Sequence, residues 1–126
     1  MSPEVEKELK EKYPKTFSKL PYFECGDGWK FIIKSVAGVI EREIEGCSDE
    51  DLAGCFSACQ VKEKFGQLRF YVYGYNETID GAIRVAERMS AHVCETCGNV
   101  GQIRDLPWIR TLCDKHFEEE LKRRGL

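Results

Sequence analysis

Two stretches of the chain repeat their apolar residues with the period of an α-helix. The first begins at Trp29, and Gly46 follows its last apolar position, where glycine commonly ends a helix. Its apolar positions are Trp29, Ile32, Ile33, Val36, Ala37, Ile40 and Ile44. The second covers 76–89, with a stripe made of Ile79, Ala82, Ile83, Ala86 and Met89. We therefore expect two main helices, each with one buried face.

The segment between these helices alternates apolar and polar side chains, which is the pattern of a half-buried β-strand. Residues 68–73 have a period of two, and they pair with the stretch from Phe56 if 64–67 forms the turn of a β-hairpin. One face of this hairpin then carries Cys59, Val61, Leu68, Phe70 and Val72, which point to the core. The opposite face carries Gln60, Lys62, Arg69, Tyr71 and Tyr73.

The remaining pattern predicts shorter elements. Residues 3–12 read as a charged surface helix that ends before Pro14. Asp27 precedes the first main helix, where we expect its carboxylate to be the N-cap. The acidic residues 49–51 are expected to open a helical turn.

Four metal-ligating residues occur in the last third of the chain as two closely spaced pairs. Two residues separate Cys94 from Cys97, two separate Cys113 from His116, and fifteen lie between the pairs. Zinc is tetrahedral, and this paired spacing is its usual sequence signature. The alternative is that these are unlinked buried thiols beside a surface histidine. The spacing favours zinc, held by a Cys₃His set.

Four protein ligands leave no coordination position for water or substrate, so this zinc is expected to be structural. A knuckle at the first pair, a connecting hairpin and a helix carrying the second pair resemble a treble-clef zinc finger. The predicted fold class is α+β: a β-hairpin or small antiparallel sheet packed with two main helices, and a C-terminal treble-clef-like zinc module. Residues 1–126 are expected to form one domain, with a body over 1–91 and the module docked on it over 92–126.

Composition narrows the functional classes. The chain has 126 residues and a net charge of −3, so any nucleic-acid or nucleotide site must be a local basic patch. No apolar run reaches the roughly twenty residues that span a bilayer, and the charged start lacks a signal-peptide core. We expect a cytoplasmic protein with no membrane partner. The cysteines outside the zinc motif are then expected to be free thiols: Cys25, Cys47, Cys55 and Cys59.

The polar hairpin face is the first candidate for ligand binding. Cations interleaved with aromatic rings suit a nucleotide, because charge binds phosphate and a ring stacks on the base. The candidate residues are Lys62, Arg69, Tyr71, Tyr73 and Gln60, with Trp29 from the Cys-Gly-Asp-Gly-Trp turn. Two alternatives remain open, namely a solvated strand face and a homo-oligomer interface. In the turn itself, a capped helix with a core tryptophan is the alternative to a ligand site.

The case for an enzyme is thin. The chain has no nucleophile elbow and no Cys–His pair outside the zinc spacing. His92 lies just before the knuckle, where it is either a spare ligand or a cation at a helix end.

Three stretches together resemble a family of small phage and prophage proteins without an assigned activity. They are YFECGDGW at 22–29, QVKEKFGQLRFY at 60–71, and the closing Cys-x-x-Cys-Gly with TLCDKH at 111–116. The resemblance covers most of the chain from Tyr22 onward. Relatives carry a second glycine where Gln67 stands, so the turn departs from the family pattern here. The resemblance implies a bacterial host cell as the setting, and it supplies no site residues.

This setting suggests a specific hypothesis: a small, non-catalytic, oligomeric protein that sequesters a nucleotide immune signal. Two alternatives belong to other classes. One is a nucleic-acid-binding zinc finger of phage replication or transcription, supported by the basic residues Arg104, Arg110, Lys115, Lys122, Arg123 and Arg124. The other is a small nuclease or phosphodiesterase.

Overall fold

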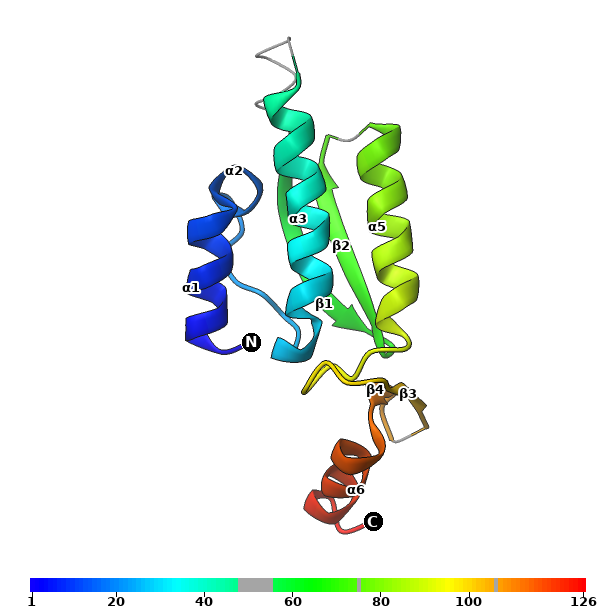
Figure 1. The fold of residues 1–126 in the computed structure, drawn as a ribbon. Coiled ribbons are helices and arrows are strands. Elements are labelled where there is room, and N and C mark those ends of the chain that lie inside the picture. The colour runs from blue at the N-terminus through cyan, green and yellow to red at the C-terminus, as the bar shows by residue number, and fades with distance from the viewer. Residues whose placement is uncertain (48–55, 75, 106) are drawn as a thin grey trace.

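The computed structural model describes residues 1–47, 56–74, 76–105 and 107–126, and it has the predicted α+β class (Figure 1). The expectations for residues 49–51 and for Cys55 lie outside the described residues. The helices are α1 (Pro3–Lys12), α2 (Pro14–Phe17), α3 (Lys30–Glu45), α5 (Glu77–Ser90) and α6 (Asp114–Arg123), with a 3-10 turn η1 (Asp27–Trp29). The strands are β1 (Ser57–Lys64), β2 (Gln67–Tyr73), β3 (Gln102–Arg104) and β4 (Arg110–Leu112).

Strands β1 and β2 form the predicted antiparallel hairpin, and α3 and α5 cover one of its faces (Figure 1). The register pairs Lys64 with Gln67, so Phe65 and Gly66 form the turn, both with positive φ (53° and 82°). Leu68 and Phe70 are buried as expected. A shift of register between Ala58 and Gln60 alters one detail of the prediction. Ala58 takes the core position, and Cys59 is only half-buried.

The N-terminal segment is more deeply packed than its pattern predicted. Helix α1 spans the predicted residues, but Leu9 is fully buried, because α1 and α2 lie against the body (Figure 1). Pro14 begins α2 instead of only ending α1. Asp27 is not the N-cap of α3: it is the first residue of η1, and its carboxylate accepts a hydrogen bond from the Ser2 N–H at 2.7 Å. The Asp27 carboxylate therefore holds Ser2, near the N-terminus, against the turn η1.

Helix α5 also protects the outer edge of β2. Ser90 is buried, and its hydroxyl accepts a hydrogen bond from the Leu68 N–H at 2.8 Å, while the Glu87 carboxylate accepts one from the Phe70 N–H at 3.1 Å. Met89, predicted on the buried stripe, is 51% exposed. Side chains of α5 thus satisfy backbone N–H groups at this strand edge, a role that a neighbouring strand would otherwise fill.

We expect Ser90→Ala to lower the free energy of unfolding by about 1 to 3 kcal/mol, because the buried Leu68 N–H loses its acceptor. Ser35→Ala is the matched control, since the exposed Ser35 hydroxyl only bonds back to the Phe31 carbonyl of its own helix. Urea denaturation of both variants measures the difference. Equal stability of the two variants would contradict this account of the strand edge.

Among the described residues, no helix combines the length and the apolar character that crossing a lipid bilayer requires.

Candidate metal centre and ligand-binding face

The four predicted metal ligands converge in the C-terminal module, whose strands β3 and β4 and helix α6 lie below the body in Figure 1. The donor atoms of Cys94, Cys97, Cys113 and His116 all lie within 4.8 Å of one another. Among the described residues, this is the one group of three or more His, Cys, Asp or Glu side chains close enough to share a metal ion. His92 is exposed and does not belong to it.

The separations between donor atoms suit a tetrahedral ion. A Zn–S bond of about 2.3 Å places tetrahedral sulfur ligands about 3.8 Å apart. The Cys97 and Cys113 sulfurs are 3.8 Å apart, and the Cys94 sulfur lies 3.7 Å from Nδ1 of His116. Cys113 Sγ and His116 Nδ1 are closer, at 3.2 Å. A metal ion at the centre can therefore be held by all four side chains with little rearrangement.

Local backbone structure aims each pair of ligands at this point. The first pair flanks a tight knuckle, in which the Gly98 N–H donates to the Cys94 carbonyl and Gly98 adopts a φ of 85° that favours glycine. Cys113 is the N-cap of α6, and its sulfur accepts from the His116 N–H. Knuckle, β3–β4 hairpin and helix follow one another in the predicted treble-clef order.

The backbone around Cys94 stabilises the thiolate form of its side chain. Burial alone raises the pKa of this thiol, but the backbone N–H groups of Cys113, Cys97 and Thr96 point at the sulfur and bring its pKa down to about 6. A metal binds the thiolate and not the thiol, so these N–H groups prepare the ligand for coordination.

The module docks on the Cys-Gly-Asp-Gly-Trp turn of the body. The indole N–H of Trp29 donates to the Val93 carbonyl at 2.8 Å, and the Gly28 N–H donates to the Glu95 carbonyl at 2.7 Å. A Cβ at Gly28 would lie only 2.1 Å from the Cys94 carbonyl oxygen. The glycine therefore permits a close approach of backbones, but the partner is the knuckle that begins at Cys94 and not a ligand. Trp29 is fully buried here, so the structure does not bring it to the predicted ligand-binding face.

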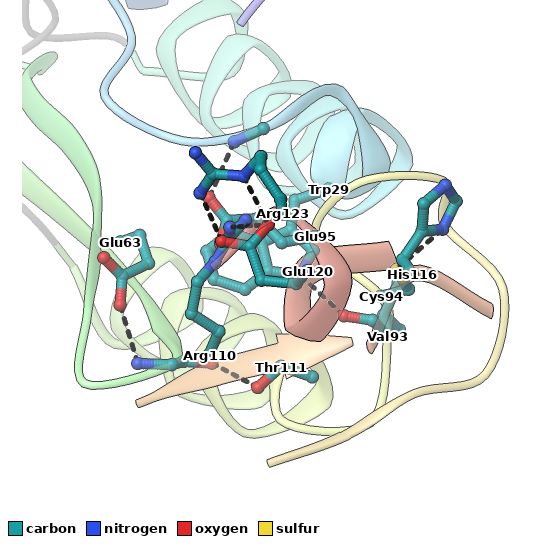
Figure 2. Close-up of polar contacts among 12 residues, drawn as sticks. Trp29, Glu63, Val93, Cys94, Glu95, Arg110, Thr111, His116, Glu120 and Arg123 are labelled. Atoms are coloured by element: carbon teal, nitrogen blue, oxygen red, sulfur yellow. Dashed lines mark hydrogen bonds and ion pairs between the residues drawn. The ribbon is translucent and has the colours of Figure 1, made fainter. Parts of the chain in front are cut away.

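Glu95 completes this junction, and no pattern in the sequence predicted its role. Its side chain is 7% exposed and accepts a hydrogen bond from the Gly26 N–H at 2.9 Å, with an Arg110 guanidinium 3.5 Å away (Figure 2). Burial raises the pKa of the Glu95 carboxyl, although Arg110 and the Gly26 N–H stabilise its charged form. A single glutamate between two cysteines gives no sequence signal, because its partner Gly26 lies 69 residues earlier.

A second attachment joins the tip of the body's hairpin to the module. The Thr111 side chain is fully buried, and its hydroxyl donates to the Gly66 carbonyl at the hairpin turn. A Cβ at Gly66 would lie 3.1 Å from the Ile109 side chain. The module is therefore attached to the body at two places, the Cys-Gly-Asp-Gly-Trp turn and the tip of the hairpin.

The predicted ligand face is the side of the hairpin that α3 and α5 leave uncovered. Lys62 lies directly opposite Arg69, and Gln60 opposite Tyr71. Tyr71 and Tyr73 are 42% and 63% exposed. The Gln60 amide donates to the Glu24 carboxylate at 3.0 Å, because Glu24 runs alongside β1. The structure thus places these five residues on one surface.

All four arginines of the set proposed for nucleic-acid binding are paired within the module. Arg104 pairs with Asp114 and lies over the Phe117 ring, and Arg110 approaches both Glu95 and Glu120. The side chains of Arg123 and Arg124 both bond to Glu120 (Figure 2 shows Arg123 beside it). Hydrogen bonds from Arg123, which has the largest effect, and from Arg124 lower the pKa of the Glu120 carboxyl to about 2. These cations stabilise the module, which weakens the case for a nucleic-acid surface here.

Comparison of the chain with models of protein families finds no match, and neither do searches among curated proteins and among solved structures.

Proposed function

We propose that this chain is a non-catalytic binding protein, stabilised by a structural zinc ion, that sequesters a nucleotide-type ligand on the uncovered face of its hairpin. The observation that carries the proposal is the pair formed by Lys62 and Arg69, which stand opposite each other on β1 and β2. Like charges in directly opposed positions destabilise a sheet. Neither cation makes an ion pair with a described residue, so an anion between them would relieve the repulsion.

Zinc is proposed because the donor set is Cys₃His and its spacing is tetrahedral. Four protein ligands would close its coordination sphere, which suits a structural role. The module also needs such an ion, because its buried apolar cluster within the described residues contains only Cys94 and Leu112, with Cys113, Phe117 and Leu121 packed beside them. So small a core rarely folds without a metal or a disulfide.

The tyrosines supply the second element of nucleotide recognition. Tyr71 lies two residues beyond Arg69 on the same face of β2, which places the two side chains about 7 Å apart along the strand. An exposed ring at that distance from a cation can stack on a base while the cation binds a phosphate. In the phage setting that the sequence motifs suggest, such a protein would withhold a nucleotide signal from a host defence system.

The test is depletion of free ligand followed by recovery. Purified protein is incubated with cyclic dinucleotides and with cyclic ADP-ribose isomers, free ligand is quantified by filtration and chromatography, and the protein is then heated. The proposal expects depletion of one of these ligands and its intact release on heating. Released product instead of ligand indicates an enzyme, and no depletion of any of them contradicts the proposal.

Two substitutions locate the site. Arg69→Ala and Lys62→Ala are each expected to weaken binding by about tenfold or more, because a charge-assisted hydrogen bond to phosphate is lost. Lys7→Ala is the control, since it removes one positive charge from the exposed surface of α1. If both site variants deplete the ligand as wild type does, the hairpin face is not the binding surface.

A further inference from the structure

The edge of β2 and the adjoining side of α5 enclose a shallow hollow of about 440 Å³. Its lining residues are Gln67, Arg69, Arg84, Glu87 and Arg88. Arg69 is also part of the uncovered hairpin face, so the hollow continues that face around the edge of the sheet. Arg84 and Arg88 are four residues apart on α5 and hence lie on the same side of the helix.

The charges in this hollow are unbalanced. Arg69 donates only to the Gln67 side chain and the Leu68 carbonyl, and Arg88 makes no ion pair with a described residue. Arg84 pairs with Asp80 of its own helix, and the Arg84 side chain is 77% exposed. Glu87 is the one carboxylate of the lining, and it is already engaged by the Phe70 N–H.

Cations outnumber carboxylates in the lining by three to one. Like charges four residues apart on a helix repel, and the third guanidinium adds to the repulsion. Arg104 and Arg110 differ, because each faces a carboxylate from another part of the chain. The hollow therefore has the charge of a site for an anion and not of a stabilising network.

We infer that this hollow binds further phosphate groups of the ligand, beside the one between Lys62 and Arg69, with Arg69, Arg84 and Arg88 as the phosphate-binding residues. Guanidinium groups bind phosphate oxygens through paired hydrogen bonds, and three of them suit a pyrophosphate or two neighbouring phosphates. The inference rests on the proposed function, because it extends the same site: the base stacks on Tyr71 and Tyr73 while the phosphates lie at the β2–α5 edge.

The test uses inorganic pyrophosphate as the probe, measured by isothermal titration calorimetry at low and at moderate salt. Wild type is expected to bind it, more weakly as salt increases. Arg84→Gln and Arg88→Gln are each expected to weaken binding about tenfold or more. Lys7→Gln on α1 removes the same charge outside the hollow and is expected to bind as wild type does.

A stability measurement separates binding from structure. Without ligand, Arg88→Gln is expected to melt at the wild-type temperature or slightly above it, because a repulsive contact is removed. A lower melting temperature would assign Arg88 a structural role and overturn the inference. So would undetectable pyrophosphate binding by wild type, or unchanged binding by both glutamine variants.

Depletion of cyclic nucleotides by the same variants is measured in a separate experiment. If wild type depletes a cyclic nucleotide and both glutamine variants do so equally well, the hollow is not the phosphate site, yet the proposed function stands. If pyrophosphate binds as expected but no nucleotide is depleted, the proposed function fails and an anion site remains.

Discussion

Removal of the metal is expected to unfold the C-terminal module and to lower the melting temperature by roughly 10 °C or more. The apolar core of the module is too small to offset the entropy of ordering two strands and a helix. Structural zinc contributes about 10 to 16 kcal/mol of apparent binding free energy in isolated zinc-finger peptides. A loss of only about 3 kcal/mol would shift the melting of a domain of this size by the stated amount.

Elemental analysis measures the bound metal, and melting curves with and without a strong chelator measure its effect on stability. We expect one zinc ion per chain in carefully purified protein and a reversible shift when zinc is restored. Cys97→Ser is expected to reproduce the effect of the chelator. Cys59→Ser is the matched control, because Cys59 is half-buried in β1 and outside the cluster. Protein that contains no transition metal, or that melts identically with chelator, would rule out the metal-stabilised module.

Gly28→Ala is expected to disrupt the docking of the module and to destabilise the protein by about 3 kcal/mol or more. The added Cβ would lie 2.1 Å from the Cys94 carbonyl oxygen and 2.6 Å from the Glu95 carbonyl carbon. Both are backbone atoms of the metal knuckle, so the collision cannot be relieved by a change of rotamer. The knuckle or the turn must move, and the Trp29–Val93 and Gly28–Glu95 hydrogen bonds are lost with it.

Gly38→Ala is the control for this prediction. A Cβ at Gly38 meets nothing within 4 Å, and the residue lies inside α3. Alanine is the better helix former, so this variant is expected to gain about 0.5 to 1 kcal/mol. Urea denaturation of the two variants, together with their zinc content, distinguishes loss of docking from loss of the metal. Gly28→Ala with wild-type stability would show that the turn does not support the module.

The predictions from sequence succeeded wherever a local pattern carries the information. The helical period located α3 and α5 to within a few residues, and alternation located β2 and the face that carries Arg69, because burial of one face imposes a period on the chain. The paired spacing singled out four residues whose donor atoms the structure brings together, since short spacings are what a knuckle and a helix start require. Cys59 was misplaced because a register shift interrupts the alternation without changing the composition.

The sequence by itself determined the two main helices, the hairpin and the residues of the Cys₃His cluster, all of which depend on neighbours a few positions apart. Only the tertiary structure decided what the Cys-Gly-Asp-Gly-Trp turn does, why Glu95 is buried and which arginines are already paired. Each of these depends on a contact between distant segments, such as Gly26 with Glu95, 69 residues apart. Such contacts form because the helices, the hairpin and the metal knuckle pack in one particular arrangement, and no local period encodes that arrangement.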